Sequence, residues 1–233
     1  MGFKFMKKWL VAVTIFMLTL ALVACGSNDD KEETTPKEPE EVEVTDEERV
    51  PDDEVILEID GEEIKGTTYN HLYKNNKIIQ TANGTLDNLD DVKQDTIDQI
   101  IYQTMLTQDA ANKGIEVTDE EFDEEYNFIK EENSEGLELL LEQFQMTEEA
   151  FKDELRHNIL YEKYIEAEFD DVEVSDEEVE EVYDELTEES ENIPPLDEIR
   201  ENLELQLRDK QIQELVTKRI DALIEEATIE EYM

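Results

Sequence analysis

The chain of 233 residues carries 67 acidic and 20 basic side chains, which gives a formal net charge of −47 at pH 7. This charge argues against nucleic acid as a partner and against binding to anionic lipid through a basic patch, because no such patch could offset the field. The single cysteine excludes an intramolecular disulfide and a cysteine-based metal cluster.

The first 24 residues differ in composition from the rest of the chain. Three lysines precede residue 9, and the 15 residues from Leu10 to Ala24 then carry no charge and are almost all apolar. A charged start followed by an apolar run is typical of an export signal. The run is shorter than the roughly 20 residues that a helix needs to cross a bilayer. We therefore expect residues 1–24 to be a signal peptide.

The apolar run ends in Leu22-Val-Ala-Cys25-Gly26, which contains the only cysteine of the chain. This ending resembles the lipobox of bacterial lipoprotein signal peptides. The resemblance implies a diacylglycerol on the thiol of Cys25 and an acyl group such as palmitate on its amino group, two lipid signals that suffice for stable anchoring. We therefore expect a lipoprotein, anchored in the cell membrane through the lipid on Cys25 and facing the outside of the cytoplasm. A plain membrane anchor with an incidental cysteine is the alternative.

Residues 25–54 read as an acidic spacer. They contain Pro36, Pro39 and Pro51 and many carboxylates, and they lack apolar periodicity. Charged segments of this kind extend by self-repulsion and cannot bury enough apolar surface to fold. We predict that the spacer is disordered and that the folded domain covers residues 55–233.

The folded part begins with a predicted β-hairpin over residues 55–64, turning at Asp60-Gly61, a pair suited to a type I′ turn. Apolar residues then recur at helical spacing over residues 66–82 and 90–112. Capping boxes at Thr118–Glu121 and Ser175–Glu178 predict the start of two more helices. A short helix near residues 137–144 and a longer one opening at Thr147 lie between them.

Pro194-Pro195 precedes a long helical segment that runs from Leu196 to about Glu225. The residues that follow, 227–232, alternate like a strand. Because a two-stranded hairpin alone is only marginally stable, we expect this strand to pair with residues 55–59. The predicted fold class is mostly α: an elongated multi-helix domain with a small three-stranded sheet formed by the N-terminal hairpin and the C-terminal strand.

The order of these segments resembles the chaperone domain of extracytoplasmic foldases of the SurA and PrsA type, in the trigger factor/SurA superfamily. The resemblance rests on the Ile59–Ile64 hairpin, on Gly114–Glu121, Met146–Glu149 and Val174–Glu178, and on the final helix opening with Pro194–Arg200. It implies a SurA-like helical domain that binds unfolded secreted or envelope proteins through an apolar groove, without a cofactor.

In those families a parvulin-type isomerase domain usually precedes the last long helix. Here only a short segment, mostly polar or acidic, separates Leu186 from Pro194, so we expect that domain to be absent. Two alternatives stay open: a peptidyl-prolyl isomerase of the same family, and a structural lipoprotein that binds a specific envelope partner.

Residues with recognisable chemistry are few. The two histidines, His71 and His157, lie on helical segments among polar neighbours, where surface or boundary positions are expected, and no nucleophilic catalytic set or defined metal site is indicated. Four residues at helical spacing are expected to be core: Phe122, Phe151, Leu155 and Ile159. The candidates for client binding, expected to be exposed where two helices meet a loop, are Tyr126, Phe144 and Met146.

Overall fold

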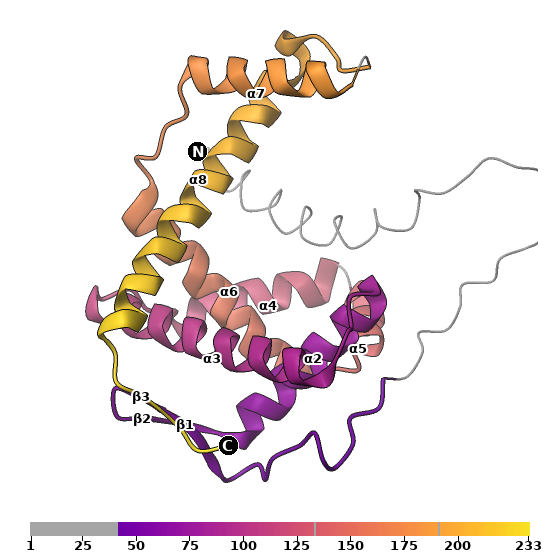
Figure 1. The fold of residues 1–233 in the computed structure, drawn as a ribbon, viewed down its shortest axis with the longest axis vertical. Helices are drawn as coiled ribbons and strands as arrows, with labels where there is room; N and C mark the ends of the chain where they lie inside the picture. The colour runs from indigo at the N-terminus through magenta and orange to yellow at the C-terminus, as the bar shows by residue number, and fades with distance from the viewer. Residues whose placement is uncertain (1–41, 133, 191) are drawn as a thin grey trace, which may run out of the picture. The chain divides into compact units, whose positions relative to one another are not determined.

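The computed structural model describes residues 42–132, 134–190 and 192–233. Three predicted features lie outside these residues: the signal peptide (residues 1–24), the lipidation site Cys25, and residues 26–41 of the spacer. The described part of the chain contains seven helices and three strands (Figure 1). In chain order they are β1 (Val55–Ile59), β2 (Glu62–Lys65), α2 (Gly66–Asn83), α3 (Leu89–Asn112), α4 (Asp119–Glu132), α5 (Ser134–Gln143), α6 (Glu148–Phe169), α7 (Asp176–Glu189), α8 (Leu196–Glu226) and β3 (Ile229–Glu231).

The sheet has the predicted three strands, in the order β2-β1-β3 with both pairs antiparallel. Asp60 and Gly61 have φ angles of 52° and 85°, so both central residues of the hairpin turn take the positive φ that a type I′ turn requires. The C-terminal strand pairs with β1 in a register that places Ile229 opposite Ile59. The mostly α fold class and the three-stranded sheet are therefore confirmed.

The main core joins the sheet to helices α2, α3, α6 and α8, and we call it the first cluster. Each helix contributes residues three, four or seven positions apart, the spacing that puts side chains on one face. The strand β1 lies at the centre of the sheet and is covered, with Leu57 and Ile59 fully buried. The cluster also includes Tyr69, Leu72 and Tyr73 of α2, Ile97 and Ile100 of α3, Tyr164 of α6, and Ile212, Val216 and Ile220 of α8.

Residues 42–54, which we call the strap, are ordered and pack on the domain. The prediction of a disordered spacer up to residue 54 is therefore wrong for this segment. The strap runs beside α2, and its Val44 and Val50 pack against the first cluster. Polar side chains also fix it, since Glu48 accepts hydrogen bonds from Tyr73 and Lys77 of α2. Composition misled the prediction because the binding partners of the strap lie on a helix that follows it, and only folding brings them together.

The helices begin where the capping boxes predict. The Ser175 hydroxyl accepts a hydrogen bond from the amide of Glu178, whose carboxylate accepts one from the amide of Ser175. Six residues, 190–195, then join α7 to α8. The Arg200 guanidinium of α8 contacts Asp176 of α7 at 2.8 Å, and the Tyr183 hydroxyl donates to the Pro194 carbonyl.

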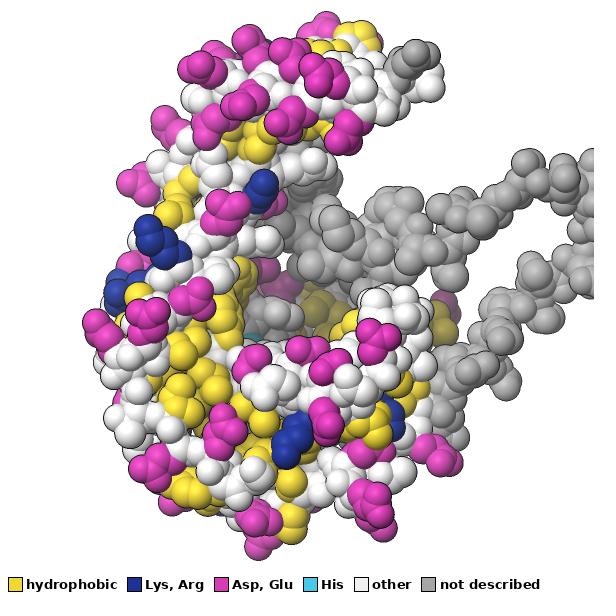
Figure 2. Space-filling model, viewed as in Figure 1, with side chains coloured by type: hydrophobic (Ala, Val, Ile, Leu, Met, Phe, Trp, Pro, Cys, Tyr) yellow, Lys and Arg dark blue, Asp and Glu magenta, His cyan; other side chains and the backbone are white. Residues whose placement is uncertain are grey.

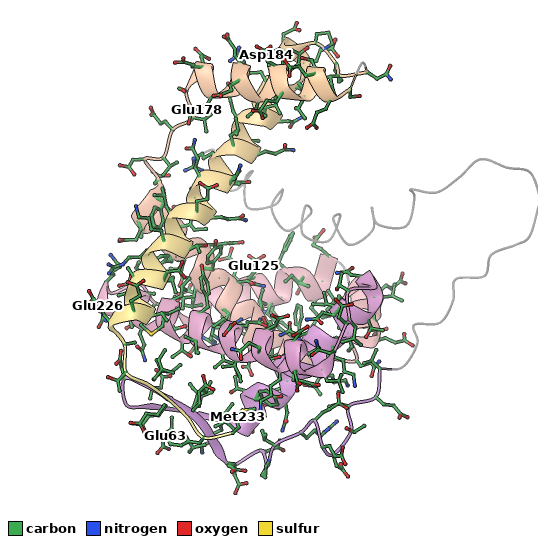
Figure 3. The ribbon with its side chains drawn as sticks, viewed as in Figure 1. Glu63, Glu125, Glu178, Asp184, Glu226 and Met233 are labelled. Carbon is green, nitrogen blue, oxygen red and sulfur yellow. The ribbon has the colours of Figure 1, made fainter. Side chains whose placement is uncertain are left out.

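Acidic side chains lie on elements throughout the described chain. Figure 3 labels Glu63 on β2, Glu125 on α4, Glu178 and Asp184 on α7, and Glu226 at the end of α8. On the face shown in Figure 2, acidic side chains far outnumber basic ones. Among the helices of the described residues, none is both long enough and apolar enough to span a bilayer.

Candidate functional site

A second group of apolar residues lies between α4 and α6, apart from the first cluster. Phe122 and Tyr126 come from α4 and Leu155 from α6, and all three are buried. The Phe122 and Tyr126 rings lie parallel with centroids 6.0 Å apart, and the Phe151 ring lies 6.5 Å from Tyr126. Partly buried residues complete what we call the α4–α6 cluster: Val117, Ile129, Phe151 and Ile159. Phe122 and Leu155 are therefore confirmed as core, and Phe151 and Ile159 pack at its edge.

Tyr126 was expected to be exposed, but only 7% of the residue is accessible, so this expectation is wrong. Its hydroxyl donates to the Glu148 carboxylate at 2.6 Å, and the Lys152 ammonium lies 4.7 Å from the centre of its ring. The Arg156 guanidinium covers Phe122 in the same way, at 4.5 Å. Cations within about 6 Å of an aromatic face are attracted by it. These ring faces are therefore occupied by side chains of the protein itself.

The charge beside the cluster is fixed by its hydrogen bonds. Lys152 and then Tyr126 donate to the Glu148 carboxylate and lower its pKa from 4.5 to about 2. Glu148 thus stays ionised at any pH near neutral and keeps the Tyr126 hydroxyl oriented. This network was not foreseen from the sequence, although Glu148 and Lys152 stand four residues apart on one helix, the spacing of a helical ion pair.

Phe144 and Met146 differ from Tyr126, since both are only half-buried. They occupy the turn after α5, in which Gln145 has a φ of 46° and the Met146 amide donates to the Leu141 carbonyl. The Lys74 ammonium of α2 donates to the Gln145 carbonyl at 2.9 Å and fixes the turn against that helix. Two of the three client-binding candidates are therefore partly accessible. Their turn is held by hydrogen bonds to α5 and to α2.

Sequence reasoning missed Leu139, whose side chain is 65% exposed on α5. The signal was present in the run of three leucines at residues 139–141, because three consecutive side chains spread over roughly 200° around a helix and cannot all lie on one buried face. Leu139 and the half-buried Phe144 and Met146 form what we call the α5 region.

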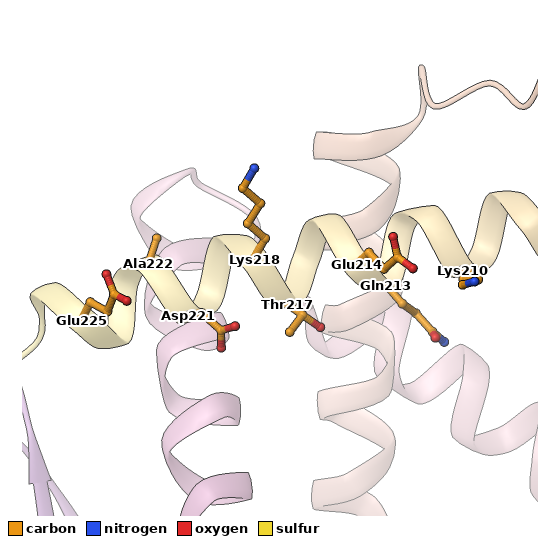
Figure 4. A pocket seen from close by; sticks show the side chains of 8 residues that line it. All are labelled: Lys210, Gln213, Glu214, Thr217, Lys218, Asp221, Ala222 and Glu225. Carbon is orange, nitrogen blue, oxygen red and sulfur yellow. The ribbon is translucent and has the colours of Figure 1, made fainter.

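Two concave surfaces elsewhere have a different character. Figure 4 shows the first, which follows one side of α8, and the second lies where the loop after α3 meets α6. Both are lined mainly by residues with charged or polar side chains. The first has Lys210, Gln213, Glu214, Thr217, Lys218, Asp221, Ala222 and Glu225 around it.

The histidines lie at boundary positions, as expected. The Nε2 atom of His71 is 3.7 Å from a carboxylate oxygen of Glu154 and 3.4 Å from the Asn75 amide nitrogen. Burial lowers the pKa of both His71 and His157 below the ordinary value of 6.5. Over the part of the chain that the structure describes, no three His, Cys, Asp or Glu side chains gather in a way that could bind a metal ion.

The architecture is that of a helical domain with a small sheet, in which the C-terminal strand β3 pairs with the N-terminal strand β1. The chain belongs to the SurA-like N-terminal domain family, whose model matches residues 3–165. It is also 31% identical, over 144 residues, to a protein of Caldanaerobacter subterraneus subsp. tengcongensis named "Foldase protein PrsA". That alignment covers 57% of this chain and 42% of the relative, so the chain spans less than half the length of that protein. No solved structure matches the chain.

Proposed function

We propose that the chain is a lipid-anchored extracytoplasmic chaperone that binds unfolded secreted or envelope proteins through apolar side chains. The observation that carries this proposal is membership of the SurA-like N-terminal domain family, together with the similarity to a protein named as a foldase. Because the alignment covers 42% of that relative, its activity is transferred here only as a proposal.

The α5 region is the best-supported contact surface for clients. Leu139 is 65% exposed, and Phe144 and Met146 lie on the turn that ends the same helix. A flexible methionine beside aromatic and aliphatic groups adapts to varied apolar surfaces, which suits ligands that share no sequence. The surrounding carboxylates favour clients rich in lysine and arginine and repel other copies of this acidic chain.

The membrane anchor rests on the sequence alone. The apolar run and the Cys25 lipobox support export and lipidation, and a lipid on Cys25 would place the domain on the outer side of the cell membrane.

A chaperone is favoured over a prolyl isomerase by the connection between α7 and α8. A parvulin-type domain would be inserted before the last long helix, yet only six residues separate α7 from α8, and the Tyr183 hydroxyl of α7 donates to the carbonyl of one of them, Pro194. The short connection supports a chaperone that lacks an isomerase domain at this position.

The test is suppression of aggregation of a reduced, unfolded model protein, with a prolyl isomerase assay run beside it. We expect suppression at near-stoichiometric ratios and no acceleration of isomerisation. The double variant Phe144→Ala/Met146→Ala should weaken suppression several-fold.

The matched control is Leu205→Ala/Leu215→Ala, which removes two side chains of 40% and 41% exposure from α8. If both double variants lose activity equally, the α5 region is not the contact surface. If the parent chain does not suppress aggregation at all, the chaperone proposal is wrong.

A further inference from the structure

The strap lies in a set of contacts that resembles a bound peptide more than an ordinary loop. Three polar residues of α2, Asn70, Tyr73 and Lys77, stand three, four and seven positions apart and so share one side of the helix. We call these three residues the α2 face. Each donates at least one hydrogen bond to the strap.

Asn70 binds the main chain of the strap. Its Oδ1 atom accepts from the Val50 amide at 3.0 Å, and its Nδ2 atom donates to the Val50 carbonyl at 2.7 Å and to a carboxylate oxygen of Asp52 at 2.8 Å. A carboxamide that meets both the N–H and the C=O of one residue replaces the hydrogen bonds of a neighbouring strand. Contacts of this kind bind the main chain of a peptide without regard to the side chain of the residue they meet.

Tyr73 and Lys77 form a carboxylate site two residues earlier in the strap. The Tyr73 hydroxyl donates to Glu48 at 2.9 Å and the Lys77 ammonium donates at 2.6 Å, while the side chains of Glu48 and Lys77 are only 7% and 12% exposed. Lys77 also donates to the Glu43 carbonyl at 2.7 Å. Charge-assisted bonds of this kind are about twice as strong as neutral ones.

The start of α2 completes the contact. The Thr67 amide and hydroxyl both donate to the Asp52 carbonyl, at 3.1 and 2.9 Å, and the Gly66 amide donates to the Glu54 carbonyl at 2.8 Å. A Cβ atom on Gly66 would lie 2.1 Å from the Pro51 carbonyl oxygen, so only glycine allows the strap to approach this closely.

We propose that the α2 face is a peptide-binding site that the strap occupies as an internal ligand. The site takes, from a separate molecule, a peptide that adopts the turn-containing conformation of the strap and carries a carboxylate two residues before the residue whose main chain meets Asn70. The α2 helix packs against α3, β1 and β2 and belongs to the first cluster, so the site does not depend on the strap for its scaffold. This inference is independent of the chaperone proposal.

The strap competes with any free peptide. The strap continues directly into β1 and is joined to α2 through the β1–β2 hairpin, so it competes from within the same chain at an effective concentration on the order of mM. A peptide from another molecule therefore binds in proportion to the fraction of chains in which the strap is open. Weakening the strap without altering α2 should raise the apparent affinity for such a peptide.

The experiment uses a fluorescent peptide with the sequence of residues 43–54, titrated by anisotropy against the full chain. The chain variant Glu48→Gln removes the carboxylate from the strap, and Glu47→Gln neutralises an exposed neighbour as the matched control. We expect about tenfold tighter peptide binding by the Glu48→Gln chain than by the parent or by the Glu47→Gln chain. The same Glu48→Gln change in the peptide should abolish the gain, whereas Glu47→Gln in the peptide should not.

Tryptic cleavage after the exposed Arg49 reports strap opening separately, because that cut requires the Val50 main chain to leave Asn70. The Glu48→Gln chain should be cut faster there, with an unchanged far-ultraviolet circular dichroism spectrum. If cleavage accelerates but the peptide does not bind, the strap is a structural segment and the proposal is wrong. Equal binding of both peptides would likewise overturn the carboxylate preference.

A second measurement on the unaltered chain remains decisive if Glu48→Gln does not fold. A peptide carrying Arg49→Gln resists trypsin, and at mM concentration it should displace the strap and accelerate cleavage of the parent chain after Arg49. A rate that does not change with peptide concentration would contradict the proposed site.

Discussion

Asp109 is a buried carboxylate at which α3, α6 and α8 meet. It accepts hydrogen bonds from the Tyr164 hydroxyl at 2.6 Å and from the Arg219 guanidinium at 2.8 and 3.3 Å. Burial works to raise its pKa, but the bonds from Arg219 and Tyr164 outweigh burial and hold the pKa below the ordinary value of 3.8. One side chain thereby links residues 110 positions apart in sequence.

Replacing this carboxylate should destabilise the domain. Asp109→Asn keeps the shape but removes the charge that pairs with Arg219, and we expect a loss of about 1–3 kcal/mol in the free energy of unfolding. Because Arg219 is 45% exposed, water can solvate it in the variant, and the loss stays below that of a fully buried pair. Urea unfolding followed by circular dichroism measures the change.

The control for this variant is Asp98→Asn, which neutralises an exposed carboxylate on the same helix. It should change stability by less than about 0.5 kcal/mol. Equal effects of the two substitutions would show that net charge, and not the contact with Arg219 and Tyr164, determines the result.

Cys25 is the residue on which the proposed anchor depends. As the only cysteine of the chain, it is the only thiol available to a lipid. We expect Cys25→Ser to leave the membrane fraction and to remain in the aqueous phase of a detergent partition, where the parent enters the detergent phase. Ser27→Ala, two residues away, serves as the control and should behave as the parent. Detergent partition of Cys25→Ser at the parental level would contradict lipidation.

At the scale of elements, β3 is the strand that turns the hairpin into a sheet. It pairs with β1 from Leu57 to Ile59, and the Tyr232 amide donates to the Ile56 carbonyl at 2.9 Å. Deleting residues 227–233 should therefore uncover β1 and lower the melting temperature by several degrees, at roughly 2–4 °C for each kcal/mol lost in a domain of this size.

The control for the deletion is Glu230→Ala, which keeps every main-chain bond of β3. Glu58 lies opposite Glu63 on one side and Glu230 on the other, so this variant also relieves a contact between like charges. We expect its melting temperature to equal or exceed that of the parent. An unchanged melting temperature after the deletion would count against a stabilising role for β3.

Most elements could be predicted because their signals are local. Apolar spacing, capping boxes at Thr118 and Ser175, and the Asp60-Gly61 turn each lie within a few residues, and the helices begin within a few positions of the predicted starts. The strap could not be predicted, because the contact of Glu48 with Tyr73 and Lys77 joins residues 25 and 29 positions apart.

The candidate site was predicted less well for the same physical reason. Periodicity places Tyr126 on a face of α4 but does not reveal that Phe122 and Phe151 pack against its ring or that Lys152 covers it. Exposure is a property of the packed neighbours, and a helical pattern alone cannot separate a core aromatic from an accessible one.

For the whole molecule, net charge governs the response to salt. With a formal charge of −47 the folded chain repels itself, and salt shortens the screening length from about 30 Å at 0.01 M to about 10 Å at 0.1 M. We therefore expect the melting temperature to rise between these two concentrations. Differential scanning fluorimetry in sodium chloride measures the melting temperature. The Asp109→Asn variant is measured alongside, because it lacks the attraction between Asp109 and Arg219 that salt also screens. A falling melting temperature would show that local ion pairs outweigh the repulsion.

The response to pH should have a maximum. Burial raises the pKa of Glu154 and Asp209, so their folded forms bind protons more readily than the unfolded chain, and stability falls as pH rises through their shifted range. The pKa of Glu48 is lowered to about 2, although its burial acts in the opposite direction, because Lys77 and Thr45 donate to it. Its contribution is complete above the ordinary value of 4.5 and is lost as pH falls through about 2.

Unfolding measured across pH therefore separates two groups of carboxylates. Stability should increase on mild acidification from neutral pH and decrease below about pH 4, with the Glu48→Gln chain losing less than the parent in the acid range. A monotonic fall from pH 7 downwards would contradict the role assigned to Glu154 and Asp209.

The pairing of β1 with β3 also sets the order in which the domain can fold. The Asp60 amide donates to the Thr228 carbonyl and the Thr228 amide to the Asp60 carboxylate, both at 2.9 Å, across 168 residues of sequence. At a synthesis rate of about 5–20 residues per second, the residues of β1 are made roughly 8–34 s before Thr228. During that time the open edge of β1 can pair with other chains, a hazard of unpaired strands. A protein proposed to shield unfolded chains is thus itself an incompletely folded chain during this interval.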